Sequence, residues 1–236
     1  MSKNLFIKKK IKKFNEVIQV DGDKSLSIRW VLLASQAIGK SKSYNLLMSE
    51  DVMAALDSIK RLGVKVKIKK NFCEIFGNGI NSFKYKENLT INAKNSGTLG
   101  RLILGLLVKS PKKIRIIGDS SLSKRDFSRI TIPLEKFGAK FYYKTKNKLP
   151  LKILGSHSIR GIKYLENKGS AQCKSSVMLA ALNASGITSI KAKKSRNHSE
   201  LLFKYLKIPI KIKKTKKYDF INVKKPKEIK AFDYQI

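Results

Sequence analysis

The sequence predicts an α/β (α+β) fold in which one supersecondary unit occurs three times around a shared helical core, with sheets outside. Three segments carry the same pattern, and they begin at Asp51, Asp126 and His198. Each has the apolar spacing of an amphipathic helix, then a short break, then the alternating pattern of a half-buried strand. One such unit cannot bury its apolar face alone, so three copies are expected to pack together.

A second pair of elements precedes each of these segments, and it completes a unit of about 70 residues. A polar turn opens an apolar helix, and a β-like stretch follows. Ser25, Ser96 and Ser170 occupy equivalent places in the three turns, at separations of 71 and 74 residues. The expected elements, in chain order, are helix 26–38, strand 43–47, helix 51–62 and strand 64–69; helix 99–108, strand 114–117, a helix from 126 to a break at Gly138 and a strand to 145; and helix 175–184, strand 187–192, a helix from 198 to a break at 208–209 and a strand to 214.

The domain organisation follows from this repeat. Residues 21–236 are expected to form the threefold-repeat lobe. Residues 1–20 have no counterpart in the repeat, and we expect there a lone strand over 5–11 followed by a hinge.

The charge of the chain is extreme, with 52 basic and 16 acidic residues and a formal net charge of +36. Such a balance favours a nucleic-acid partner through counterion release. However, only eight of the 52 basic residues are arginine, although arginine is the residue favoured for bidentate recognition of phosphates and bases. The lysines alternate with apolar residues in segments 64–69 and 208–213, which predicts solvated faces of strands. We therefore do not expect nucleic acid to be the main partner.

Other classes of protein fit poorly. No apolar run approaches the roughly 20 residues of a transmembrane helix, and the basic start lacks a signal-peptide apolar region, so a cytoplasmic location is expected. Cys73 and Cys173 lie a hundred residues apart without a CxxC motif, so neither a disulfide scaffold nor a metal site is predicted. His157 and His198 belong to no recognisable catalytic triad.

The three polar turns are the strongest functional feature. Helix N-termini offer unpaired N–H groups and partial positive charge, and so bind phosphate or carboxylate. Each turn has a nearby cation, and the hinges before the second helices add more. This set predicts a site for one or two small polyanions, and its members are Lys24, Arg29, Arg101, Lys124, Arg125, Lys174 and Arg196.

These motifs resemble, in order and spacing, the 5-enolpyruvylshikimate-3-phosphate synthase family. The resemblance covers essentially the whole chain, and it rests on Asp21–Arg29 (DGDKSLSIR), Asn95–Thr98 (NSGT) with Arg101, Gly118–Arg125 (GDSSLSKR), Gly169–Ser175 (GSAQCKS) and Ser195–His198 (SRNH). It implies two lobes, each built from three βαβαββ units as an inside-out α/β barrel, a fold shared with RNA-terminal cyclases. It also implies transfer of the enolpyruvyl group of phosphoenolpyruvate to the 5-hydroxyl of shikimate 3-phosphate, without a cofactor.

The resemblance also implies roles for individual residues. Shikimate 3-phosphate would be bound by Lys24, Ser25, Arg29, Ser170, Ala171, Gln172 and Arg196. Phosphoenolpyruvate would be bound by Lys24, Asn95, Gly97, Thr98, Arg125 and Gln172.

Family members are roughly twice as long as this chain, and the family's catalytic acidic residues and lysine lie in the other half. We therefore expect a truncated or split form that is one lobe of a two-lobe enzyme, is monomeric and has no general acid or base of its own. A separately encoded second lobe would complete it. Two alternatives stay open: an inactive fragment, and a basic nucleic-acid-binding protein of the same fold.

Overall fold

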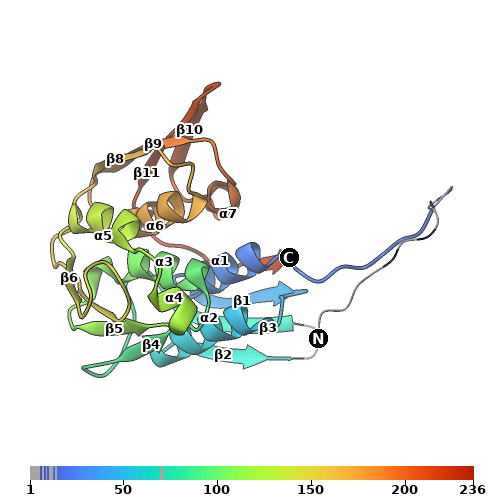
Figure 1. The fold of residues 1–236 in the computed structure, drawn as a ribbon, viewed down its shortest axis with the longest axis horizontal. Coiled ribbons are helices and arrows are strands. Elements are labelled where there is room, and N and C mark those ends of the chain that lie inside the picture. The colour runs from blue at the N-terminus through green and yellow to red at the C-terminus, as the bar shows by residue number, and fades with distance from the viewer. Residues whose placement is uncertain (1–5, 7, 9, 11–12, 14, 70–71) are drawn as a thin grey trace.

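The computed structural model describes residues 6, 8, 10, 13, 15–69 and 72–236, and it contains the three expected repeats (Figure 1). The first repeat contains α1 (Lys24–Ala34), β1 (Ile38–Tyr44), α2 (Glu50–Arg61), β2 (Lys65–Ile68) and β3 (Phe72–Asn78). The second contains β4 (Thr90–Asn92), α3 (Gly97–Leu106) with the 3-10 turn η1 (Leu107–Lys109), β5 (Ile114–Ile117), α4 (Ser120–Ser123), α5 (Ser128–Glu135), β6 (Lys140–Tyr143) and β7 (Leu151–Leu154). The third contains β8 (Lys163–Glu166), α6 (Ala171–Ala181), β9 (Ile187–Lys193), α7 (His198–Tyr205), β10 (Ile210–Lys214) and β11 (Tyr218–Lys224), and β12 (Asp233–Gln235) follows it.

The three sheets have one topology. Their strand orders are β12-β1-β3-β2, β4-β5-β7-β6 and β8-β9-β11-β10. In each sheet the first two strands are parallel and the later pairs are antiparallel. Strand β12, which pairs Asp233 with Lys42 of β1, takes the place in the first sheet that β4 and β8 take in theirs. The last segment of the chain therefore completes the first repeat and closes the threefold arrangement.

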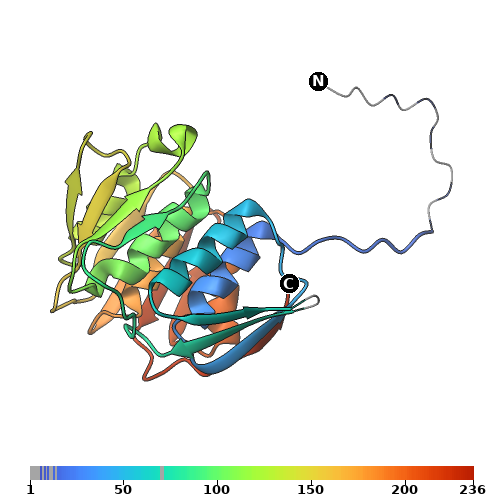
Figure 2. The same cartoon turned by 90° about the horizontal axis from the view of Figure 1, so that it is seen from below.

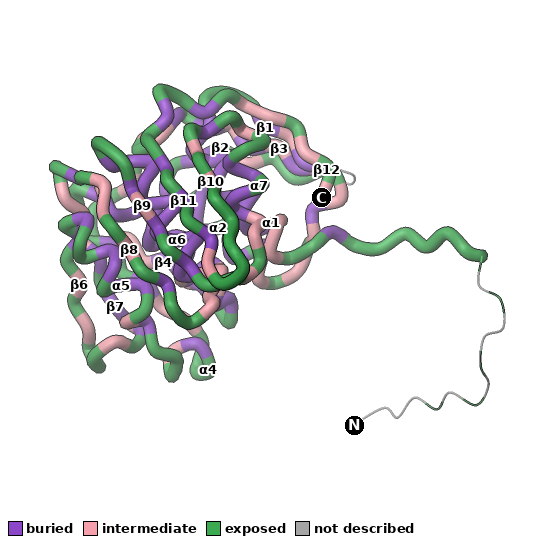
Figure 3. The backbone as a smooth tube through the Cα atoms, turned by 90° about the horizontal axis from the view of Figure 1, so that it is seen from above, coloured by how far each residue is buried: buried purple, intermediate pink, exposed green. Residues whose placement is uncertain are grey.

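The first helix of each repeat lies in the centre, and the sheets lie outside (Figures 1 and 2). Residues 27–34 of α1 and 173–181 of α6 are all buried, as expected for helices surrounded by protein on every side. The buried segments accordingly lie inside and the exposed ones along the outer strands (Figure 3). Helices α3 and α6 approach closely at Gly105, where an added Cβ would lie 2.2 Å from the Ser176 carbonyl oxygen.

The structure confirms the predicted fold class but corrects several boundaries. Helix α1 ends at Ala34, not at residue 38, and the strand expected at 43–47 occupies 38–44. The cause is tertiary, because the Ile38 amide donates to the Ile229 carbonyl oxygen at 2.7 Å and β1 pairs along its whole length with β3. Helix α6 begins at Ala171, four residues earlier than expected, and the short helix α4 was not predicted.

The prediction of a lone strand and a hinge in residues 1–20 can be compared with the structure only in part. Four residues of the strand expected at 5–11 lie outside the described residues. Residues 15–23 form neither helix nor strand; 15–20 are exposed, and the segment extends outward from the body on the side before residue 19 (Figure 2). The assignment of residues 1–20 to another lobe stays a prediction.

Candidate anion-binding site

The N-termini of α1, α3 and α6 meet at one end of the helical core. The Arg29 Nη2 atom, in the second turn of α1, donates to Ser175 Oγ of α6 at 3.1 Å. The Gln172 Nε2 atom, in the first turn of α6, donates to Thr98 Oγ1 of α3 at 3.0 Å. Because helix N-termini carry partial positive charge, this shared end attracts anions.

Each helix begins with a side-chain cap. Asp23, Ser96 and Ser170 accept from the backbone N–H three residues further on, at 2.7, 3.3 and 3.3 Å. The caps therefore account for one polar side chain at each turn. The predicted site residue Ser25 is not a cap, and its half-buried side chain lies in the first turn of α1.

The α1 side of the site contains two cations in different surroundings. Lys24 is exposed and its Nζ lies 3.0 Å from Asp51 Oδ2, an ion pair that water and salt weaken. Arg29 is buried, and its Nη1 donates to the Ser25 carbonyl oxygen at 3.0 Å. Burial lowers the pKa of Arg29 to about 10, while Glu200 opposes this shift. Arg29 is thus still a cation at neutral pH, and its position is fixed.

The α3 side brings two guanidinium groups to one glycine. A Cβ added to Gly97, the first residue of α3, would lie 2.9 Å from Arg101 Nη1 and 3.0 Å from Arg125 Nη1. Arg101 Nη1 also donates to Gln172 Oε1 at 2.7 Å, and this links it to α6. A small anion at this helix end would therefore meet two cations without steric obstruction from a side chain at position 97.

A buried carboxylate shapes the turn before α6. Glu166, which is 2% exposed, accepts from the amides of Lys168 and Ser170 at 3.1 and 2.9 Å. Its Oε1 also lies 3.3 Å from Arg129 Nη2. The buried carboxylate of Glu166 thus fixes the turn that carries Ser170 and Ala171. Sequence reasoning missed Glu166, and its only signal was a carboxylate four residues before the cap.

The structure groups most of the predicted residues in two neighbouring sets. Asn95, Gly97, Thr98, Arg101, Arg125 and Gln172 surround the start of α3, where Asn95 Nδ2 donates to Asp119 Oδ2 at 2.6 Å. Lys24, Ser25 and Arg29 lie at the start of α1, and Arg196, exposed before α7, is close enough to lower the pKa of Arg29 electrostatically. Lys124, exposed at the end of α4, makes no side-chain hydrogen bond or ion pair to either set within the described part of the chain.

The prediction that Lys174 is one of the cations that meet a bound anion directly is wrong. Its side chain is fully buried, and its Nζ lies 2.5 Å from Glu200 Oε1 of α7. Position 174 follows the polar turn closely in sequence, but it is on the inner face of α6, so Lys174 points into the core. Ser175 and Ser199 donate to or accept from the network that holds Arg29, and sequence reasoning missed both. Ser175 ends the Gly169–Ser175 motif and was given no role, and Ser199 lies just after the Ser195–His198 motif.

The carboxylates around the site are engaged already. Asp23 and Asp119 cap helices, Asp51 pairs with Lys24, and Asp126 accepts from Ser128 N and Oγ, both at 2.7 Å. Backbone and side-chain hydrogen bonds lower the pKa of Asp119 and of Asp126. All four carboxylates stabilise local structure, and the lowered pKa makes Asp119 and Asp126 weaker proton acceptors.

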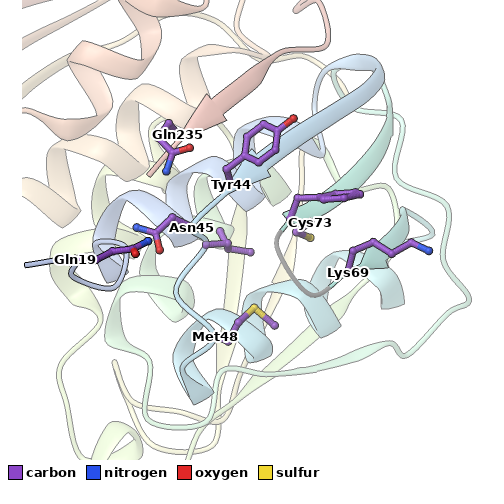
Figure 4. Close-up of a pocket in the computed structure, with 9 residues that line it drawn as sticks. Gln19, Tyr44, Asn45, Met48, Lys69, Cys73 and Gln235 are labelled. Atoms are coloured by element: carbon purple, nitrogen blue, oxygen red, sulfur yellow. The ribbon is translucent and has the colours of Figure 1, made fainter.

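A separate cavity of about 370 Å³ lies where the two ends of the lobe meet (Figure 4). Tyr44, Asn45 and Cys73 line it together with Gln19 and Gln235, and none of the predicted site residues does. The Asn45 Nδ2 atom donates to the carbonyl oxygens of Val20 at 3.3 Å and Ile236 at 2.9 Å. Asn45 therefore ties the entering and leaving segments of the lobe together, away from the helix N-termini.

Neither a metal centre nor a membrane helix is found in the part of the chain that the structure describes. No group of three or more His, Cys, Asp or Glu residues there is placed to hold a metal ion. No described helix is long and apolar enough to cross a membrane.

Comparisons with known proteins agree with the architecture. Residues 8–236 match the family described as EPSP synthase (3-phosphoshikimate 1-carboxyvinyltransferase). The 3-phosphoshikimate 1-carboxyvinyltransferase of Streptococcus pyogenes serotype M4 (strain MGAS10750) is 40% identical over 185 residues, which cover 78% of this chain and 43% of that protein. The enzyme of the same name from Lactococcus lactis subsp. lactis (strain IL1403) is 39% identical over 185 residues, again 78% of this chain and 43% of that protein.

A solved structure of EPSP synthase from Acinetobacter baumannii superposes with a TM-score of 0.85 at 30% identity. The match covers 93% of this chain and 49% of that chain. This chain therefore spans about half the length, or slightly less, of the relatives that it matches.

Proposed function

This chain belongs to the EPSP synthase family, and from that premise we propose that its helix N-terminal face binds shikimate 3-phosphate and takes part in enolpyruvyl transfer. In this reaction the 5-hydroxyl oxygen of shikimate 3-phosphate bonds to C2 of phosphoenolpyruvate. The bond from C2 to the phosphate oxygen breaks, and phosphate leaves. The proton of the 5-hydroxyl group passes to a base or to solvent. Both substrates are anions that carry a carboxylate and a phosphate.

The observation that carries the proposal is the convergence of three helix N-termini with fixed cations at one end of the core. Arg29 is held by α6 and α7, and Arg101 is held by Gln172 of α6. Such preorganised charges and N–H groups bind anions without a large ordering cost. Two neighbouring sets of groups match two anionic substrates.

We propose for the individual residues the roles that the family resemblance implies, and their positions at the helix starts support these roles. At the α1 and α6 starts, we assign Lys24, Ser25 and Arg29 to the carboxylate and hydroxyl side of shikimate 3-phosphate. The 3-phosphate and ring are assigned to Ser170, Ala171, Gln172 and Arg196. At the start of α3, Asn95, Gly97, Thr98 and Arg125 are assigned to phosphoenolpyruvate, with Lys24 and Gln172 reaching both substrates.

The chain by itself is proposed to bind without turning over, because the nearby carboxylates are engaged in caps and ion pairs. A general base for the 5-hydroxyl proton would have to come from a second lobe. A mixture with a homologous second lobe should form product, whereas product formation by the chain alone would contradict this part of the proposal.

The binding proposal is tested by titrating the chain with shikimate 3-phosphate and following ¹⁵N–¹H spectra and heat of binding. We expect saturable shifts in the first turns of α1 and α6 at up to millimolar ligand. Arg196→Ala should weaken binding by about 10- to 150-fold, since a hydrogen bond to a charged group contributes roughly 1.5–3 kcal/mol. The matched control is Arg61→Ala, an exposed arginine whose partner is Asp57 on the same helix. An unchanged spectrum at millimolar ligand would contradict the proposal.

A further inference from the structure

Five charged side chains are buried among the described residues, and three of them lie together. Arg29 of α1, Lys174 of α6 and Glu200 of α7 are 4%, 0% and 3% exposed. The other two, Glu166 and Asp219, lie elsewhere. Burying a charge is unfavourable unless it is paired and hydrogen-bonded, so this group of three requires an explanation.

The two cations in this group have different partners. Lys174 Nζ lies 2.5 Å from Glu200 Oε1. Arg29, by contrast, donates only to neutral oxygens in the described structure: Ser199 Oγ at 2.9 Å, Ser175 Oγ at 3.1 Å and the Ser25 carbonyl oxygen at 3.0 Å. The Glu200 carboxylate therefore pairs with Lys174. It also lies near enough to Arg29 to raise the pKa of Arg29 electrostatically.

The network is built from neighbouring residues of two helices. Lys174 and Ser175 are consecutive on α6, and Ser199 and Glu200 are consecutive on α7. Ser199 Oγ donates to Ser175 Oγ at 2.7 Å, which joins the part that holds Arg29 to the part that holds the ion pair. The second oxygen of Glu200, Oε2, is buried and has no hydrogen-bond partner in the described structure. Among the charged groups, Glu200 has the largest electrostatic effect on the pKa of Arg29, so removal of Lys174 would leave the Glu200 charge to act on Arg29.

The charges of the three groups sum to one net positive charge beneath the helix N-termini. With Lys174 present, that charge resides on Arg29, the member nearest the proposed substrate. Without Lys174, Glu200 and Arg29 would neutralise each other, and an anion above them would lose its attraction, because charge interactions are strong where water is excluded.

We propose that Lys174 is a positioning residue: it occupies the carboxylate of Glu200 and thereby leaves the charge of Arg29 available to the carboxylate of the bound substrate. This inference rests on the proposed function of the site. It differs from a purely structural tie between α6 and α7, because it predicts that removing the carboxylate as well restores substrate binding.

Three variants test the inference through the dissociation constant of shikimate 3-phosphate: Lys174→Met, Glu200→Gln and the double variant. Lys174→Met should weaken binding about tenfold, the scale of a lost interaction with a charged group. The double variant restores the net charge on Arg29 and should bind within about threefold of the unmodified chain. Glu200→Gln alone should bind as tightly as the unmodified chain or more tightly.

Lys40→Met is the matched control, since it removes a lysine whose Nζ lies 3.4 Å from Glu74 on an outer sheet. It should leave the dissociation constant unchanged. Melting curves accompany each titration to show that the variants are folded. A double variant as weak as Lys174→Met, with both folded, would overturn the inference and support a structural tie.

If Lys174→Met does not fold, the affinity of Glu200→Gln for shikimate 3-phosphate tests the inference by itself. A tenfold loss of affinity in that folded variant would overturn the inference. Failure of the unmodified chain to bind shikimate 3-phosphate would contradict the proposed function itself, and with it this inference. Binding by the unmodified chain without rescue in the double variant contradicts only the role of Lys174.

Discussion

Replacing Gly97 by alanine tests whether the start of α3 is an anion site. The added Cβ would lie 2.9 Å from Arg101 Nη1 and 3.0 Å from Arg125 Nη1. Ordinary contacts between such atoms begin near 3.5 Å, so each guanidinium end must move by about 0.5 Å. The obstructing atoms are the ends of flexible side chains, and the backbone of α3 need not move.

The expected effect is a loss of affinity with little change in stability. Arg101 Nη1 donates to Gln172 Oε1 at 2.7 Å, and a shift of this size weakens that bond as well as the contact with a bound anion. The loss of one or two such bonds corresponds to about 1–2 kcal/mol, or about five- to thirtyfold in the dissociation constant. Alanine in a helix is favoured over glycine by about 0.5–1 kcal/mol, which offsets the strain in the folded state.

The assay is an NMR titration with phosphoenolpyruvate in the presence of shikimate 3-phosphate, with a melting curve for each protein. Gly100→Ala is the matched control on the same helix. Its Cβ would make only ordinary contacts, at 3.4 Å to Ala93 Cβ and 3.6 Å to Leu122 Cδ2. We expect Gly97→Ala to weaken phosphoenolpyruvate binding and Gly100→Ala to leave it unchanged.

Two results would refute this reasoning. Equal phosphoenolpyruvate affinity for Gly97→Ala and the unmodified chain would show that the two arginines do not converge on the ligand. A drop of more than about 5 °C in melting temperature for Gly97→Ala would show that the backbone, not the side-chain ends, absorbs the added methyl group.

Three further predictions concern stability and reactivity. Gly105→Ala should lower the melting temperature by about 5–10 °C, since its Cβ would lie 2.2 Å from the Ser176 carbonyl oxygen of α6 and overpacking costs about 1–3 kcal/mol; a drop below about 2 °C would contradict the close helix contact. Burial raises the pKa of the Cys73 thiol to about 11, so at pH 8 Ellman's reagent should modify it about a hundredfold more slowly in the native chain than in urea, and complete native reaction within seconds would contradict its burial. The lowered pKa of Asp119 means that its stabilising effect is complete above its unfolded pKa of about 3.9 and is lost as pH falls through the lower folded value. Between pH 5 and 3, melting temperatures should therefore fall less steeply for Asp119→Asn than for the unmodified chain, and parallel curves would argue against this carboxylate as a source of acid lability.

The sequence predicted the repeat and the caps because both depend on local chemistry. Ser96 and Ser170 cap their helices as expected of serine before an apolar helix. The element ends depend on distant partners, and Ile38 is an example. Its helical pattern is overridden by pairing with residue 229, which is 191 residues away.

The candidate site was predictable only where a motif marked it. Lys174 follows the polar turn and carries the right charge for an anion site, but Glu200 faces it from α7. No local pattern shows that these two helices pack together with both side chains inward. The two serines that hold Arg29 were missed for the same reason, since their role exists only after α1, α6 and α7 have assembled.

The net charge of +36 divides between two environments with different physical roles. Lysines on the outer faces of the sheets lie over aromatic rings, as Lys42 does over Phe72 at 3.9 Å, Lys113 over Tyr142 at 4.7 Å and Lys191 over Tyr218 at 4.8 Å. These three pairs belong to three different sheets, so their charge is spread around the lobe and does not form one groove. Arg29 and Arg101 at the helix N-termini are instead fixed by hydrogen bonds at a single end of the core. Because a fixed charge loses little conformational freedom when a ligand binds, these few arginines are the ones suited to selective recognition of a small anion.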